Sequence, residues 1–203
     1  MRVDPMTSIG FLGVPDHTPA AQGLFDEDVS DLGYVMNVSR LWAYQPSTFN
    51  GLFALIRETT SAHRLDVRQR GILVAACAST LGDSYCSLAW GGKLAAAADA
   101  QTASAVIRGD DHGLTGGEAA MAGWARKVAR DPNGTRGTDV QALRDVGYSD
   151  AEIFAITIFV ALRVAFSTVN DALGARPDAE LCSSAPGAVL DAVTFGRPIE
   201  DRT

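Results

Sequence analysis

The shortest connection in the sequence constrains the fold most. Two long apolar stretches, residues 65–81 and 84–108, are separated only by Gly82 and Asp83. Glycine commonly ends a helix, and aspartate is among the residues preferred at the position that caps a helix start. The sequence therefore predicts two long helices that form a tight hairpin, with Gly82 ending the first and Asp83 capping the second.

The rest of the chain also has the pattern of an all-α protein. Apolar residues at helical spacing predict helices over residues 37–44 and 47–61. Ser or Thr followed three residues later by Glu or Gln is typical of a helix start, and this pattern occurs at Thr115, Thr138 and Ser149. The helix from Ser149 to about Leu173 is apolar on nearly every side, so we expect it at the centre of the bundle.

The domain organisation follows from where this pattern begins. Residues 1–23 are rich in Pro, Gly and Thr, and we expect an irregular N-terminal arm there. Residues 24–203 are expected to form a single helical domain, with a tail after Pro177 that is irregular except for a short turn near residues 188–193. No segment has the pattern of a strand.

Charge and composition exclude several classes of protein. The formal net charge is −7 and no cluster of Lys and Arg stands out, which argues against nucleic acid as a partner. Three cysteines do not make a secreted disulfide framework, and the first residues lack the apolar region of a signal peptide. The apolar run at residues 153–166 is shorter than the roughly 20 residues of a membrane-spanning helix. We expect a cytoplasmic protein with no membrane partner.

No metal or other cofactor is expected. His17, His63 and His112 have no ligand spacing between them, and Asp110-Asp111-His112 falls in a predicted loop. Gly91-Gly92-Lys93 lacks the upstream glycine and the preceding strand of a phosphate-binding loop.

The helix start at Asp83-Ser84-Tyr85-Cys86 is the strongest candidate for chemistry. A cysteine in the first turn of a helix faces the positive end of the helix dipole and free backbone N–H groups, and both favour the thiolate. The carboxylate of Asp83 acts in the opposite direction, because a nearby like charge disfavours a second negative charge.

In order and spacing, several segments of the chain resemble the AhpD-like (alkylhydroperoxidase/carboxymuconolactone decarboxylase) superfamily, and its peroxidase-related branch most of all. The resemblance covers roughly residues 24–200. It depends on residues 32–38 (LGYVMNV), Pro46, residues 82–86 (GDSYC), residues 143–153 (LRDVGYSDAEI) and residues 195–199 (FGRPI). It implies an all-α helical bundle that assembles as a dimer, trimer or hexamer.

The resemblance also implies a site with a Cys-x-x-Cys pair, a Glu twelve residues before the first Cys and a His four residues after the second. In this chain those positions hold Gly71, Asp83, Cys86 and Trp90, so only one of the four motif residues remains. A disulfide cycle within the motif is therefore excluded. Carboxymuconolactone decarboxylases also depend on a His in this region, which argues against that activity.

Each candidate residue has a structural and a functional interpretation, and both stay open at this stage. Asp83 is a helix cap, or an acid or base, or both. Cys86 is a residual nucleophile or a small buried apolar residue, and Trp90 is core or the apolar wall of a ligand pocket. Tyr85 is a candidate catalytic residue beside them, and Ser84, Gly71 and Tyr34 are candidate pocket residues.

Three hypotheses for the function follow. The first is a divergent enzyme that binds or transforms a small, partly apolar molecule with Asp83 as acid or base. The second is an alkylhydroperoxidase-type oxidoreductase that uses Cys86 alone. The third is a non-catalytic oligomeric scaffold. The first two predict a cavity beside Asp83 and Cys86, and the third predicts that Trp90 fills it.

Overall fold

The computed structural model describes residues 10–199, and every regular element in that range is a helix. A single 3₁₀ turn, Pro132–Gly134, follows the seventh helix. The α-helices are α1 (Pro19–Leu32), α2 (Asn37–Trp42), α3 (Pro46–Ala62), α4 (Val67–Leu81), α5 (Ser84–Ala97), α6 (Ala100–Arg108), α7 (Gly116–Arg130), α8 (Gly137–Asp145), α9 (Asp150–Leu173), α10 (Ala179–Ser184) and α11 (Gly187–Ala192).

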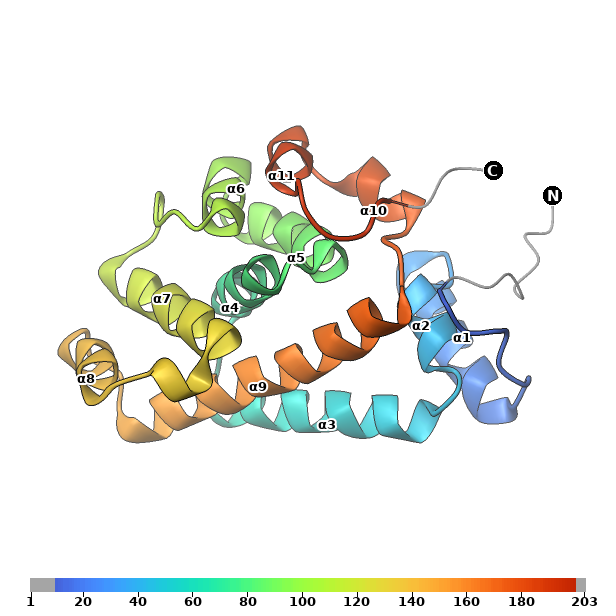
Figure 1. Cartoon of the computed structure of the whole chain (residues 1–203), viewed down its shortest axis with the longest axis horizontal. Helices are drawn as coiled ribbons and strands as arrows, with labels where there is room; N and C mark the ends of the chain where they lie inside the picture. Colours follow the sequence, from blue (N-terminus) through green and yellow to red (C-terminus); the bar gives the residue numbers. More distant parts are fainter. Residues whose placement is uncertain (1–9, 200–203) are drawn as a thin grey trace.

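Helix α4 is the centre of the bundle, and α5, α6, α7 and α9 pack around it (Figure 1). Its residues from Gly71 to Ala78 are all buried. Helix α3 runs alongside α9. Aromatic rings join α9 to α2 and α3, because Phe166 of α9 stacks on Trp42 of α2 at 5.7 Å and meets Phe53 of α3 edge-on at 5.3 Å. The predicted all-α bundle is confirmed.

The predicted hairpin joint is also confirmed. Gly82 adopts the left-handed conformation at φ 78°, and the backbone N–H of Asp83 donates to the carbonyl of Ala78 at 2.9 Å. These bonds satisfy the last carbonyls of α4, as expected at a glycine C-terminus. The side chain of Asp83 then caps α5 by accepting from the N–H of Cys86.

Several expected helix boundaries differ from the structure. The predicted helix 84–108 is two helices, because Asp99 caps a new helix by accepting from the N–H of Thr102. Residues 19–23, expected in the irregular arm, belong to α1, where Thr18 is the cap and Pro19 fits the first turn. Residues 1–9 of the predicted arm lie outside the described residues. The capping boxes at Thr115 and Ser149 are confirmed.

Two further corrections concern α8 and the tail. Helix α8 begins at Gly137, where the carboxylate of Asp139 accepts from the backbone N–H of Arg136 at 3.0 Å, and the cap is not the predicted pair of Thr138 and Gln141. The tail expected to be mostly irregular contains α10 as well as α11, which lies at the predicted turn. Both α10 and α11 pack against α5, and α11 also packs against α6.

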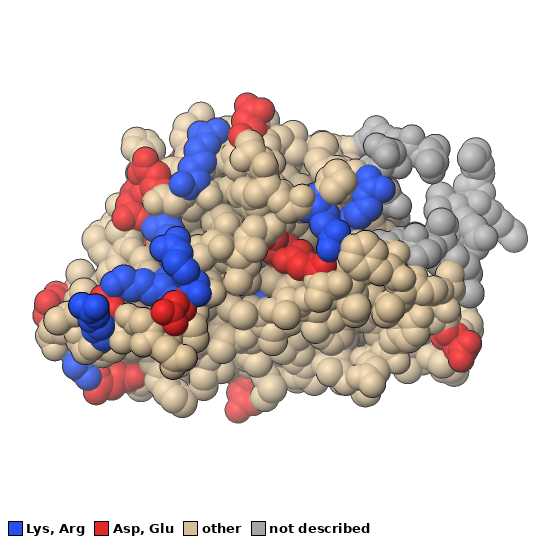
Figure 2. Space-filling view, in the orientation of Figure 1, with Lys and Arg blue, Asp and Glu red and all other residues tan. Residues whose placement is uncertain are grey.

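Helix α9 is half-buried, and not apolar core on every side as expected. Its length and composition would allow a membrane-spanning helix, but 44% of its most apolar window is buried, and a core helix passes the same test. One face packs on α3, α4 and α7. The opposite face leaves Phe154 68% exposed, together with the small residues Ala161 and Ala165. Figure 2 shows that the surface over α9 and α3 carries few charged side chains.

Candidate functional site

The carboxylate of Asp83 is buried completely and is fixed at both oxygens. One oxygen accepts from the backbone N–H of Cys86 at 2.9 Å, and the other accepts from the hydroxyl of Ser167 on α9 at 2.5 Å. Asp83 is therefore a helix cap, as one interpretation predicted. It also joins the start of α5 to the second half of α9 through Ser167. A helix cap alone does not require a contact of this kind.

Arg163 of α9 brings a positive charge to the same place. Its side chain is 3% exposed, and one guanidinium nitrogen lies 3.5 Å from the sulfur of Cys86. The guanidinium also faces the rings of Trp90, at 5.5 Å, and Phe166, at 5.2 Å. Its Nε has no hydrogen-bond partner. A buried charge is costly unless it is paired, and the ion pairs of residues 10–199 do not include Arg163, so the sulfur of Cys86 and the two rings are its contacts in this structure.

The thiol of Cys86 lies among these groups. Burial raises its pKa well above the usual range, and the carboxylate of Asp83 raises it further, while the positive charge of Arg163 lowers it. The net effect is to favour the thiol of Cys86 over the thiolate. Cys77 on α4 is also buried, and burial raises its pKa to about 12.

Trp90 follows Cys86 by one helical turn and is half-buried. Its ring contacts two cations: the ammonium of Lys93 is 4.7 Å from the ring centre and the guanidinium of Arg163 is 5.5 Å from it. Aromatic faces attract cations in this geometry. Trp90 thus helps to hold Arg163 beside Cys86, which neither the core nor the ligand-wall interpretation included.

Tyr85 and Tyr34 belong to a second polar cluster and do not approach Asp83 through any described bond. The hydroxyl of Tyr85 donates to the buried carboxylate of Asp178, which also accepts from the N–H of Asn37 at 2.8 Å. Burial and the charge of Asp178 raise the pKa of Tyr34 and of Tyr85. The structure therefore brings Asp83 and Cys86 together and directs Tyr85, expected as a catalytic partner, towards the start of α10 and the start of α2.

The candidate pocket residues Gly71 and Ser84 have different surroundings. Gly71 is buried against α5, and a side-chain carbon at that position would lie 3.0 Å from the Cβ of Leu94. At this position, where the resemblance implies a Glu, Leu94 therefore occupies the space next to the backbone. Ser84 lines a cavity of about 450 Å³ together with Leu88, Cys182, Leu190 and residues 193–199. Asp83 and Cys86, at 0% and 2% exposure, do not line it, so this cavity is not the one that the first two hypotheses predicted beside both residues.

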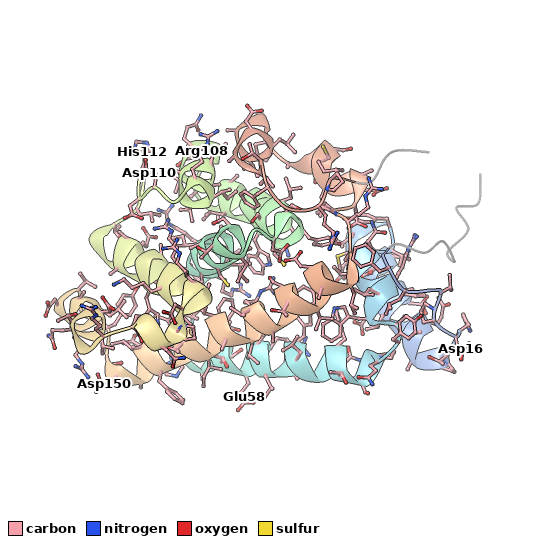
Figure 3. All side chains as sticks on the ribbon, in the orientation of Figure 1. Asp16, Glu58, Arg108, Asp110, His112 and Asp150 are labelled. Atoms are coloured by element: carbon pink, nitrogen blue, oxygen red, sulfur yellow. The ribbon has the colours of Figure 1, made fainter. Side chains whose placement is uncertain are left out.

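Sequence reasoning missed Arg163 and Ser167 as site residues. The signal for Arg163 was present, because it is the one charged residue inside the apolar run 153–166. Ser167 follows it by one turn on the same face. Among residues 10–199, no group of three or more His, Cys, Asp or Glu side chains could hold a metal ion. Asp110 and His112 lie in the loop between α6 and α7, at the edge of the molecule (Figure 3).

No protein-family model and no curated protein matches the sequence. Solved structures match the fold. An uncharacterised peroxidase-related protein from Silicibacter sp. TM1040 is 21% identical over 86% of this chain and 95% of its own, with a TM-score of 0.75. An alkylhydroperoxidase AhpD core protein from Ralstonia eutropha JMP134, also described as peroxidase-related, is 22% identical over 85% of this chain and 94% of its own, with a TM-score of 0.72.

The debrominase Bmp8 has the same fold. An alanine variant of it in complex with 2,3,4-tribromopyrrole is 16% identical over 92% of this chain and all of its own, with a TM-score of 0.69. These similarities define the chain as an all-α protein with the AhpD-like fold, shared by peroxidase-related proteins and a debrominase. At these identities they show the fold alone.

Proposed function

We propose that the chain is an enzyme that transforms a small, partly apolar molecule, with Asp83 as the acid or base. The observation that carries the proposal is the buried cluster of Asp83, Cys86, Arg163 and Ser167. Packing alone would be served by apolar residues at these positions, since burying charged and polar groups contributes little net stability. A carboxylate held in a water-poor interior is a physically reasonable general base.

Each member of the cluster has a role in this proposal. The hydroxyl of Ser167 and the N–H of Cys86 orient the carboxylate of Asp83, and the aromatic rings orient Arg163. A guanidinium in a low-dielectric site stabilises negative charge that develops on a substrate or on the sulfur of Cys86. The motif positions held by Gly71, Asp83 and Trp90 lack the groups of a dithiol peroxidase, which supports a different chemistry.

Turnover by an Asp83→Asn variant tests the proposal, because Asn also caps helices but does not act as a base. The probes are cumene hydroperoxide and, because a protein of the same fold binds it, 2,3,4-tribromopyrrole, each with a dithiol reductant. We expect the variant to lose at least about 100-fold of any turnover, the range of general-base catalysis. Equal turnover by the variant and the parent protein would remove Asp83 from the mechanism.

A second candidate function is favoured by the contact between Arg163 and Cys86. A guanidinium 3.5 Å from the sulfur stabilises a thiolate once the site opens, so Cys86 could reduce peroxides alone, with an external thiol completing the cycle. Hydroperoxide consumption that disappears in Cys86→Ser but persists in Cys77→Ser is the expected result. Consumption that persists in Cys86→Ser would contradict this candidate.

The homo-oligomer is also a proposal, and the sparsely charged face of α9 and α3 supports it. Helix α9 has 24 residues and is about 36 Å long. Helix α3 has 17 residues and is about 26 Å long, so two adjacent helices about 10 Å wide would offer roughly 600 Å² per subunit, somewhat below the roughly 800 Å² per partner of a standard interface. In sedimentation, we expect Ala161→Glu to shift the protein to monomer and Ala96→Glu, at an exposed site on α5, to leave it unchanged. A monomeric parent protein would contradict the proposal.

A further inference from the structure

Residues 193–199, which we call the strap, cross directly over the joint between α4 and α5. The carbonyl of Arg197 accepts from the hydroxyl of Ser84 at 2.8 Å. A side-chain carbon at Gly196 would lie 2.4 Å from the carbonyl oxygen of Gly82 and 2.8 Å from the nitrogen of Ser84. The strap therefore covers the same turn of chain that positions Asp83 and Cys86.

A small number of hydrogen bonds to main-chain carbonyls hold the strap. The guanidinium of Arg197 donates to the carbonyl of Asp171 at 2.6 Å, and that of Arg176 donates to the carbonyls of Ile199 at 2.7 Å and Pro198 at 3.2 Å. The strap has no regular secondary structure of its own. Segments tied down by few bonds open at a lower free energy than helices in the core.

Between the strap and helices α5, α10 and α11 lies the cavity of about 450 Å³. Ligand cavities are typically about 300–1,000 Å³, mainly apolar, with a few polar groups. This one has a lining of that kind, in which the polar members are Ser84, Thr194, Cys182 and the charged Arg197, and the apolar ones are Leu88, Leu190, Val193, Phe195, Pro198 and Ile199. Ser84 connects the cavity to the candidate site, because it lines the cavity and directly follows Asp83 in the chain.

We propose that this cavity binds a small, uncharged, mainly apolar molecule and that the strap is its movable wall, opening towards Asp83 and Cys86. The proposal of a binding site depends only on the cavity. The statement that the bound molecule is the substrate of Asp83 rests on the function proposed above. Without an opening of this kind, Asp83 and Cys86, at 0% and 2% exposure, have no contact with a substrate.

Cys182 provides a reporter for binding, because it lines the cavity and is partly exposed, while Cys77 and Cys86 are buried. The experiment measures the rate at which iodoacetamide labels each cysteine, resolved by mass spectrometry of peptides, with indole as the uncharged probe. We expect saturating indole to slow labelling of Cys182 at least fivefold, and indole-3-carboxylate to have a much smaller effect. Equal labelling rates with and without indole would overturn the binding site.

Two variants on α11 control this measurement. Leu190→Trp fills the cavity and should abolish the protection by indole, whereas Asp191→Trp places the same side chain at an exposed position that does not line the cavity. Slow labelling of Cys77 verifies that each variant is folded. Protection that persists in Leu190→Trp would place indole elsewhere and overturn the assignment.

The movable wall has its own test. Arg197→Met removes the donor to Asp171, so we expect labelling of Cys86 to accelerate severalfold while Cys77 stays slow. Faster labelling of both cysteines would indicate general unfolding. That result, or unchanged labelling of both, would contradict the strap as a movable wall. Asp83→Asn should leave protection of Cys182 unchanged, so a failure of the proposed chemistry and a failure of the binding site give different results.

Discussion

The interior of the molecule contains two regions of opposite character. Where α4 meets α7, buried residues such as Ala76, Met121 and Ala125 are apolar and 0% exposed. Where the start of α5 meets the second half of α9, buried residues include Asp83, Arg163 and Ser167. Packing of apolar side chains, as in the first region, is sufficient for stability and requires no further role. The second needs every partner in place to avoid a penalty, which is the usual character of a functional site and not of a core.

The largest expected effect comes from breaking the polar region. Asp83→Ala removes the cap of α5, the acceptor of Ser167 and the negative charge near Arg163. We expect the free energy of unfolding in urea to fall by about 3–4 kcal/mol, because a helix cap is lost and the buried hydroxyl of Ser167 is left without its acceptor. Asp83→Asn keeps the cap and should lose less. A loss below about 1 kcal/mol in Asp83→Ala would mean that neither bond of the carboxylate stabilises the fold.

A substitution in the apolar region tests the other half of the comparison. Met121→Ala leaves a cavity between α4 and α7, and we expect a loss of about 3 kcal/mol. The titratable group that contacts Met121 is Tyr148, whose hydroxyl donates to the sulfur at 3.7 Å. Burial raises the pKa of Tyr148 further above its usual value, so the loss should be the same at pH 5 and pH 8. A loss that differs between these two pH values would show that the apolar region is coupled to a titrating group.

Tyr85→Phe tests whether the second polar cluster acts independently of Asp83. The variant loses the bond to Asp178, so we expect a cost of about 1–3 kcal/mol. Under the proposed mechanism, turnover should change little. A loss of turnover as large as that of Asp83→Asn would return Tyr85 to the catalytic site.

A smaller effect concerns Asp171, which is half-buried near Asp83 and Arg197. Burial, and then the charge of Asp83, raise its pKa to about 6. A raised carboxyl pKa favours the folded state while the group is protonated, so this contribution is present below about pH 4 and is lost as the pH rises through 6. Allowing for solvent screening, we expect Asp171→Asn to be more stable than the parent by about 1 kcal/mol at pH 7, with the difference vanishing near pH 4. A constant difference between these pH values would contradict the shift.

The smallest effect on stability is expected at the outer face of α9. Phe154 is 68% exposed, so Phe154→Ala should change the unfolding free energy of the monomer by less than about 0.5 kcal/mol. If the face binds a second copy, the apparent stability will instead depend on protein concentration, and the variant will weaken that dependence. Melting curves at two concentrations distinguish the two cases.

The sequence predicted the features that depend on neighbouring residues. The Gly82-Asp83 joint, the cap of α5 and the boxes at Thr115 and Ser149 are local, and each appears where it was expected. The break at Asp99 was missed, although its cap is also local, because the alanine-rich flanks favour a continuous helix.

The composition of the candidate site depends on distant contacts, which local patterns do not encode. Ser167 is 84 residues from Asp83, and Tyr85 is 93 residues from Asp178. Helical spacing places Cys86 and Trp90 on one face, but it does not reveal which residue of another helix faces them. Arg163 could have been singled out as a lone charge in an apolar helix, yet its partner could not.

Gly196 offers a marker for comparing this chain with others. It adopts φ 77°, and its α-carbon passes so close to the carbonyl of Gly82 that any larger residue displaces the backbone. Position 196 therefore tolerates no other amino acid while the strap keeps this path. Homologous sequences can be divided at this position: those that retain glycine are expected to cover the helix joint as here, and those with another residue must leave it open or cover it by a different route.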